Sequence, residues 1–373
     1  MFKGPLATLK VVEFAGLGPA PLAGQLLADL GAEVTVIDRA SAPAQAWDIN
    51  RRGKSSIALN LKSDAGHAAA MRLIAQADVV IEGFRPGVME KLSLGPDDCP
   101  ETLVYARMTG WGQSGPLAQT AGHDLTYLAL TGVLHMIGAK DGPPLPPLNL
   151  VADFGGGTMF LLLGILSAIF ERGVSGKGQV VDAAMIDGVP ALAGMILGWL
   201  GQGTWQETRG SNLLDGGAPF YRCYTCSDGK HIAFAALEPQ FFAEFVDLAG
   251  VSDADKALQY DRAHWPDMHA RYEALFASRP RDAWAALFAP TDACVAPVLT
   301  LEEAAAHPHN AARAMYLSQH DTQHPHPAPR FSRSVAEARP VATAPGADAE
   351  TVLKRLGYSE TEIAALRQEG VLT

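Results

Sequence analysis

Two polar side chains that lie in largely apolar stretches, His123 and Asp153, have residue types suited to proton transfer. The stretch AGHDLTYLALTG, residues 121–132, places His123 and Tyr127 four residues apart, so in a helix they share one face. Asp153 lies just before Gly155, Gly156 and Gly157 and a strongly apolar helix, which is the position of a helix N-cap. One imidazole and one carboxyl could exchange protons with a single carbon atom.

The local sequence also predicts how each group is tuned. We expect His123 to begin a helix after Gly122, where the helix dipole favours the neutral imidazole, which can act as a base. We expect the three glycines to leave bare N–H groups at a helix start, where they would stabilise an enolate oxygen. The same dipole favours an ionised Asp153, so burial must oppose it if the carboxyl is to act as an acid. A structural histidine and a capping aspartate remain the simpler interpretations of these residues alone.

The elements around these residues read as a parallel α/β sheet. The opening LKVVEFAGLGPAPLAGQLLADLGAEVTVID is a strand, a turn, an amphipathic helix and a second strand, and DVVIEGF and TLVYARMTGWG supply further strands. Alternating strands and helices predict a Rossmann-like domain with ligands at the carboxyl ends of its strands. Gly16, Gly18 and Asp38 allow a weak NAD alternative, because Pro21 replaces the third glycine of the dinucleotide fingerprint. Residues from about 221 to 300 mix a hairpin with helices and predict a second, smaller α+β domain.

Composition excludes several classes of protein. A formal net charge of -11 over 373 residues argues against a nucleic-acid-binding surface. Residues 1–62 nevertheless carry seven Lys/Arg against five Asp/Glu, so we expect an anionic small molecule to bind in this part. The apolar run at 159–170 is shorter than the roughly 20 residues of a membrane span, and we expect none.

Four cysteines with irregular spacing do not form a disulfide framework, which favours a reduced, cytoplasmic setting. Cys223 and Cys226 lie three apart in an expected strand, so they point to opposite faces and predict no metal site.

Four segments carry a resemblance that runs in order over nearly the whole chain: EGFRPGVMEKLSLGPDD, GHDLTYLALTGVL, VADFGGGTMFLLLGILSAIFERGVSGKGQVVDAAM and AALEPQFF. They resemble the family III CoA-transferase superfamily and, within it, the alpha-methylacyl-CoA racemases. The resemblance implies epimerisation of 2-methylacyl-CoA thioesters between the 2R and 2S forms through an enolate. His123 and Asp153 would be the two acid/base residues, supported by Asp124 and Glu238. No metal, flavin or pyridoxal would be required, because CoA is part of the substrate.

The resemblance also implies a CoA site, a domain plan and a homodimer. The residues expected to hold CoA are Arg39, Leu59, Asn60, Leu61, Lys62, Gly83, Phe84, Arg85, Lys91, Gly122, Leu125, Thr126 and Tyr127. Lys91 replaces an arginine of some relatives, which would turn a bidentate phosphate contact into a point charge. A large CoA-binding domain would comprise 1–185 with 325–373, joined by linkers at 186–220 and 301–324 to a small domain at 221–300. The dimer would be interlocked, with Glu238 reaching the site across the interface.

Two other functions remain open at this stage. A CoA transferase of the same fold would use Asp153 as a nucleophile that attacks the thioester and forms an acyl anhydride, but such relatives generally lack the histidine of the GHD motif. An acyl-CoA binding protein without turnover would use His123 and Asp153 only to fix its ligand. The sequence does not identify the acyl chain.

Overall fold

The computed structural model describes residues 4–39, 48–319, 322–341 and 344–372. Contacts divide the chain into two compact units. Unit 1 comprises 1–131, 148–192 and 314–373, and unit 2 comprises 132–147 and 193–313. Both ends of the chain therefore lie in unit 1. The expected bounds of the large domain, the two linkers and the small domain stay a prediction.

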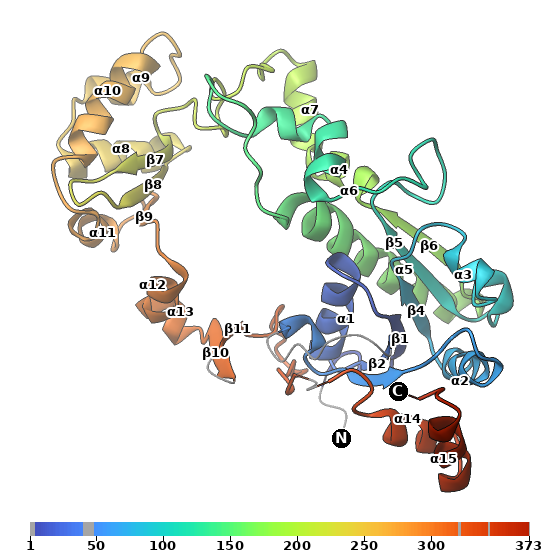
Figure 1. Cartoon of the computed structure of the whole chain (residues 1–373). Helices are drawn as coiled ribbons and strands as arrows, with labels where there is room; N and C mark the ends of the chain where they lie inside the picture. Colours follow the sequence, from blue (N-terminus) through green and yellow to red (C-terminus); the bar gives the residue numbers. More distant parts are fainter. Residues whose placement is uncertain (1–3, 40–47, 320–321, 342–343, 373) are drawn as a thin grey trace. The chain divides into compact units, whose positions relative to one another are not determined.

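Unit 1 is built on a six-stranded sheet with the strand order β3-β2-β1-β4-β5-β6 (Figure 1). The strands are β1 (Lys10–Phe14), β2 (Glu33–Asp38), β3 (Ser55–Ala58), β4 (Val79–Glu82), β5 (Val104–Thr109) and β6 (Val180–Ala184). Every pairing is parallel, which confirms the predicted α/β fold. The order reverses between β1 and β4, and in such sheets ligands bind at the carboxyl ends beside that reversal.

The sheet is buried between helices on both faces, as its continuous apolar strands require. β4 is buried at all four positions and β2 at all but its first. The helices of unit 1 are α1 (Pro19–Asp29), α2 (Asp64–Ile74), α3 (Val88–Lys91), α4 (Asp124–Leu130), α5 (Met159–Ser175), α6 (Met185–Leu192), α14 (Ala349–Arg355) and α15 (Glu360–Gln368), with short 3-10 turns at Ile49–Arg51 and Pro96–Asp98. Unit 1 also holds a two-stranded antiparallel ribbon of β10 (Tyr316–Gln319) and β11 (Thr322–Pro325).

The C-terminal helices share one core with the N-terminal strands. Val12 and Phe14 of β1 lie in the same buried cluster as Val352 and Leu353 of α14 and Leu366 of α15. Figure 1 shows α14 and α15, in red, beside β2 and α2. The first and last parts of the chain therefore stabilise each other.

One continuous helical stretch, 150–175, meets the length and composition of a membrane span with a mean hydropathy of 1.7. It joins a π-helix (Leu150–Thr158) to α5. A third of its 18 most apolar consecutive residues is buried, and α5 contacts β5 and β6 of the sheet. This stretch is longer than the apolar run counted from the sequence, and the expected lack of a membrane span stays a prediction.

Unit 2 holds a three-stranded antiparallel sheet, β7 (Tyr221–Thr225), β8 (His231–Ala235) and β9 (Val295–Pro297). Its helices are α7 (Gly194–Gly201), α8 (Pro239–Ala249), α9 (Ala254–Leu258), α10 (Trp265–Phe276), α11 (Arg281–Phe288), α12 (Leu301–Ala306) and α13 (Pro308–Ala312), with a 3-10 turn at Val133–Met136. The core is aromatic: the rings of Phe234 and Phe245 lie 3.9 Å apart. This α+β unit agrees with the smaller domain expected from the sequence.

Cys223 and Cys226, three positions apart, differ in burial. Cys223 is exposed on β7, Cys226 is buried just after it, and both are free. Among the described residues no group of three or more His, Cys, Asp and Glu side chains is arranged to hold a metal ion. The cytoplasmic location inferred from cysteine usage stays a prediction.

Candidate active site

The expected CoA residues follow the strands of unit 1 at their carboxyl ends. Arg39 comes directly after β2, Leu59 after β3 and Gly83 after β4. Because these strands are parallel, their carboxyl ends meet at one edge of the sheet. Three segments of the expected CoA site therefore lie at this edge, although Arg39 and Gly83 are 44 residues apart in the chain.

A cavity of about 510 Å³ opens at this edge, and Arg39, Gly83 and Phe84 line it. Arg51 and Lys54, which the sequence analysis did not single out, lie in the same wall. The cavity is large enough for a substantial part of a nucleotide-sized ligand. It lies in the part of the chain where the charge balance predicted an anionic molecule.

The turn at Gly83 and Phe84 is held by a buried carboxylate. One oxygen of Glu82 accepts from the backbone N–H of Phe84 at 2.7 Å, and the other accepts from Arg107 Nε at 2.8 Å. Burial raises the pKa of the Glu82 carboxyl, while the Phe84 N–H and Arg107 lower it. Glu82 gave no signal in the sequence, because it stands inside an apolar strand.

The remaining basic residues of the expected set, Lys62, Arg85 and Lys91, are exposed and lie outside the lining of the cavity. Leu59 is buried, and the N–H of Asn60 donates to the carbonyl of Val371 at 3.0 Å. Their contacts with CoA, like those of the half-buried Leu61, stay predictions.

Tyr127 is packed tightly against two glycines. A Cβ at Gly122 would lie 2.4 Å from Tyr127 Cε1, and a Cβ at Gly110 would lie 2.0 Å from its Cζ. The indole of Trp111 meets the same ring edge-on with centroids 4.8 Å apart. Burial raises the pKa of the Tyr127 hydroxyl, and the Asp153 carboxylate raises it further while Arg85 lowers it. Tyr127 therefore lies within electrostatic reach of both the expected CoA region and Asp153.

His123 stands at the N-cap of α4, as predicted, with its side chain exposed. Its backbone N–H donates to Thr126 Oγ1 at 2.9 Å, and that hydroxyl donates back to the His123 carbonyl at 2.8 Å. This exchange fixes the first turn of α4 and leaves the imidazole without a partner among the described residues. Leu125, on the same turn, is exposed as well.

Asp124 ties the start of α4 to the segment that carries Asp153. Its Oδ2 accepts from the N–H groups of Ala152, at 2.9 Å, and of Asp153, at 2.8 Å. The side chain is 7% exposed, and its Oδ1 has no hydrogen-bond partner within the described part of the chain. Asp124 therefore sets the distance between the two candidate acid/base residues, which agrees with a supporting role.

Asp153 does not cap a helix, and that prediction is wrong. The helix begins three residues earlier, and Asn149 is its N-cap. Asp153 lies inside the π-helix, a form that is rare and occurs often at functional sites. Burial raises the pKa of its carboxyl above the ordinary 3.8; the Asn149 amide, 3.4 Å from Oδ2, lowers it, Asp124 raises it and His123 lowers it. Burial thus opposes ionisation, which is the condition that acid catalysis by Asp153 requires.

The three glycines after Asp153 serve packing and not a helix start, which corrects a second expectation. A Cβ at Gly156 would lie 2.8 Å from Val189 Cγ2, and a Cβ at Gly157 would lie 3.1 Å from Met185 Cγ. Gly155 similarly faces Leu192. The glycines let α6 approach the π-helix closely, so they do not form the bare N-terminal oxyanion site that we expected.

The Asp153 carboxylate faces the loop after β1. Gly18 has φ +74°, and a Cβ there would lie 3.6 Å from Asp153 Oδ2. Thr158, which ends the π-helix, donates from Oγ1 to the carbonyl of Pro19 at 2.9 Å. The glycines of this loop, which suggested a dinucleotide, thus allow the loop to pass beside the Asp153 carboxylate.

Asp38 is not available to a ribose. Its two oxygens accept from Arg51 at 3.1 and 2.7 Å, and Ser56 donates to it as well. The carboxylate is buried and already satisfied, so the position reserved for the ribose contact of NAD is taken.

Glu238 lies in unit 2, at the N-cap of α8, with an exposed side chain. Its expected support of His123 stays a prediction. Asn149 and Trp111 are neighbours of the site that the sequence analysis missed, and Gly18 was considered there only for the dinucleotide alternative. Gly18 alone carried a usable signal, as one of two glycines directly after an apolar strand.

The chain matches known proteins along almost its whole length. Residues 6–351 match the model of the CoA-transferase family III. Alpha-methylacyl-CoA racemase of Mus musculus is 43% identical over 98% of this chain and 97% of its own length, and that of Homo sapiens is 40% identical over the same shares. The crystal structure of a CAIB/BAIF family protein from Brucella suis has a TM-score of 0.80 at 26% identity and covers 95% of this chain and 100% of that protein. The chain belongs to CoA-transferase family III.

Proposed function

We propose that this protein epimerises 2-methylacyl-CoA thioesters by transferring one proton from, and another to, the same carbon. The observation that carries the proposal is the link through Asp124, which joins the turn of His123 to the backbone of Asp153. The similarity to two alpha-methylacyl-CoA racemases at 43% and 40% identity supports it. A CoA-thioester epimerase is the activity that fits both observations.

In the proposed reaction, one of the two groups removes the α-proton as the C–H electron pair moves into the thioester. The resulting enolate spreads its charge onto the carbonyl oxygen, and the other group delivers a proton to the opposite face of the carbon. A positioned acid or base of this kind typically increases the reaction rate about 10²–10⁴-fold. The burial that raises the pKa of Asp153 keeps its carboxyl able to donate at a higher pH than an exposed aspartate.

The cavity at the carboxyl edge is proposed to receive the CoA portion of the substrate. Arg39 provides a cationic group in its wall, whereas Arg51 is already paired with Asp38, and Phe84 provides an apolar surface. The exposed Lys62, Arg85 and Lys91 are proposed to meet phosphates at its rim. No additional cofactor or metal enters this chemistry, because the thioester itself acidifies the α-proton.

We propose further that the protein is a homodimer. Three side chains of α5, spaced along one face, are open to solvent: Leu163 is 61% exposed, Phe170 81% and Val174 86%. Large apolar side chains exposed on one face of a helix mark a surface that another protein covers. The covering surface in this proposal is a second copy of the chain.

The test compares His123→Ala with Asp153→Ala in two assays, epimerisation of a 2-methylacyl-CoA and exchange of CoA between acids. Both variants should lose epimerisation, and the wild type should show no CoA exchange. A transferase would show CoA exchange that Asp153→Ala abolishes and His123→Ala leaves largely intact. A binding protein would bind the thioester tightly and catalyse neither reaction.

A further inference from the structure

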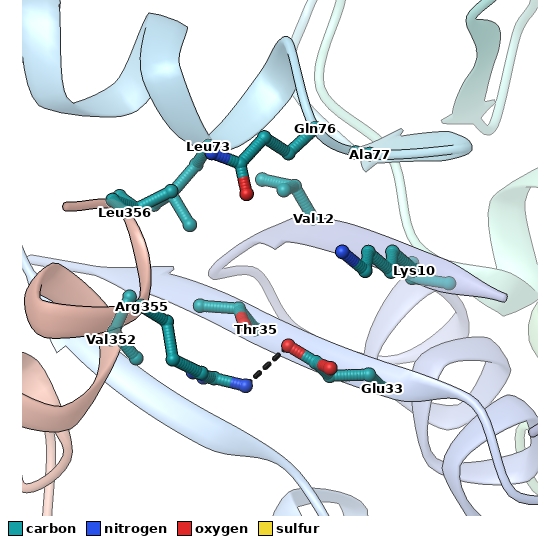
Figure 2. Close-up of a pocket in the computed structure, with 11 residues that line it drawn as sticks. Lys10, Val12, Glu33, Thr35, Leu73, Gln76, Ala77, Val352, Arg355 and Leu356 are labelled. Carbon is teal, nitrogen blue, oxygen red and sulfur yellow. Dashed lines mark hydrogen bonds and ion pairs between the residues drawn. The ribbon is translucent and has the colours of Figure 1, made fainter. Parts of the chain in front are cut away.

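A second cavity lies outside the candidate active site, at the amino ends of β1 and β2. Its volume is about 250 Å³, and Figure 2 shows the residues that line it. The strand register places Lys10 beside Glu33 and Val12 beside Thr35, all on the sheet face that contributes to the core with α2 and α14. The candidate active site lies at the carboxyl ends of the same strands, so this cavity is at the opposite edge of the sheet.

Part of the cavity wall is hydrocarbon. Val12 of β1, Leu73 of α2, and Val352 and Leu356 of α14 all line it. Side chains of this kind favour an apolar ligand surface over water. The volume corresponds to about eight water molecules at roughly 30 Å³ each, which suits a small organic molecule.

The polar part of the wall carries an excess of positive charge. Arg355 is ion-paired with Glu33, as the dashed line in Figure 2 marks. The ammonium group of Lys10 has no ion-pair partner among the residues that the structure describes. One negative charge on a ligand would therefore be matched, whereas Glu33 would repel a second.

Thr35 adds an unsatisfied polar group. It is 4% exposed, and its hydroxyl has no hydrogen-bond partner among residues 4–39, 48–319, 322–341 and 344–372. The hydroxyl is not enclosed, because Thr35 lines the cavity, and a ligand oxygen there can accept its hydrogen bond in place of water. Because Thr35 lines the cavity, that ligand would reach it from the cavity side.

We propose that this cavity binds a small organic monocarboxylate with a hydrocarbon tail of about four to six carbons. The carboxylate lies against the Lys10 ammonium, the unused guanidinium N–H groups of Arg355 and the Thr35 hydroxyl. The tail lies against Val352 and Leu356. Inorganic phosphate fits less well, because it brings a second charge toward Glu33 and leaves the hydrocarbon wall uncovered.

The test is a titration of the full-length protein with hexanoate, followed by ligand-detected saturation-transfer NMR and calorimetry. We expect saturable binding in the millimolar range that excess CoA does not displace. Lys10→Met should weaken it about tenfold or more, and so should replacing hexanoate by the uncharged hexanamide. Thr35→Val should weaken it severalfold, since it removes the hydroxyl and keeps the shape of the side chain.

Lys177→Met is the matched control, since Lys177 is an exposed lysine that does not line this cavity, and it should bind like the wild type. Thermal unfolding verifies that each variant is folded. If Lys10→Met does not fold, Lys10→Gln takes its place. Displacement of hexanoate by CoA would overturn the proposal. Binding of hexanoate by Lys10→Met and Thr35→Val as tightly as by the wild type would also overturn it. So would the lack of any saturable binding to the wild type.

Discussion

At the residue scale, the protonation of Asp153 links the proposed chemistry to the stability of the fold. Burial raises the pKa of this carboxyl, so the folded protein holds its proton more tightly than the unfolded chain does. The stability that this group contributes is therefore present below its unfolded pKa and is lost as the pH rises through its folded pKa. At neutral pH an ionised Asp153 costs the folded state free energy.

Asp153→Asn should accordingly separate activity from stability. We expect epimerisation to fall by about 10²–10⁴-fold, because the acid/base group is gone. The free energy of unfolding at pH 7 should stay equal or rise, since the amide carries no charge to bury, and the gain should shrink as the pH falls. Urea denaturation at several pH values measures the free energy of unfolding of the variant and of the wild type. Glu207→Gln, at an exposed position, is the control, and a marked loss of stability in Asp153→Asn alone would contradict the interpretation.

What the sequence could predict at this scale depends on how local each signal is. His123 was placed correctly at a helix start, because Gly122 and Asp124 beside it are typical of one. Asp153 was misplaced, because the π-helix depends on packing between Gly156 and Val189, residues that lie more than thirty positions apart. Asn149 could not be found, since its contact with Asp153 exists only in that helix.

At the scale of elements, the approach of α6 to the π-helix should be intolerant of added atoms. Gly156→Ala would push a Cβ to 2.8 Å from Val189 Cγ2 and 2.9 Å from its backbone nitrogen. We expect a loss of about 1–3 kcal/mol in the free energy of unfolding, as for overpacked cores. Urea denaturation provides the measurement.

Gly173→Ala, in α5, is the matched control. A Cβ there meets nothing within 4 Å, so we expect no loss and a gain of up to about 1 kcal/mol from helix propensity. Equal stability of the two alanine variants would show that the packing against α6 is looser than the structure indicates.

The buried pair of Glu13 and Lys54 should anchor α1 beside the cavity. Lys54 Nζ lies 2.6 Å from Glu13 Oε2 and donates to the Pro21 carbonyl at 2.8 Å. Burial raises the pKa of the Glu13 carboxyl and lowers that of the Lys54 ammonium. Removing one partner therefore leaves the other without its compensating charge.

We expect Lys54→Met to lower the free energy of unfolding by about 3–5 kcal/mol. The double variant Glu13→Gln/Lys54→Met should recover much of that loss, because it leaves no unpaired buried charge. Denaturation of the wild type, both single variants and the double variant gives the coupling between the two residues. Additive losses would show that the pair does not act as a unit.

Elements with strong periodicity were predictable from the sequence, and elements defined by distant partners were not. The apolar runs at 10–14, 33–38, 79–82 and 104–109 all form strands of the sheet. The ribbon of β10 and β11 falls almost wholly in 301–324, which the sequence analysis expected to be only a linker. The two strands pair antiparallel, with Tyr316 opposite Pro325, and composition does not reveal such a register.

At the scale of the whole molecule, the exposed face of α5 predicts self-association. Phe170→Glu places a charge in the middle of this apolar face and should shift the protein toward the monomer in sedimentation velocity. Leu301→Glu, at an exposed apolar position of α12 in unit 2, is the control and should leave the sedimentation coefficient unchanged. A wild type that sediments as a monomer at micromolar concentration would contradict the homodimer.

The central claim concerns a single hydrogen atom of the substrate. The most direct measurement is proton NMR of the purified protein with one epimer of a 2-methylacyl-CoA in heavy water. The proposed mechanism predicts that the α-proton signal disappears while the opposite epimer forms and the 2-methyl doublet collapses. If the α-proton persists with several acyl chains, the protein does not catalyse 1,1-proton transfer, and the proposed function is wrong.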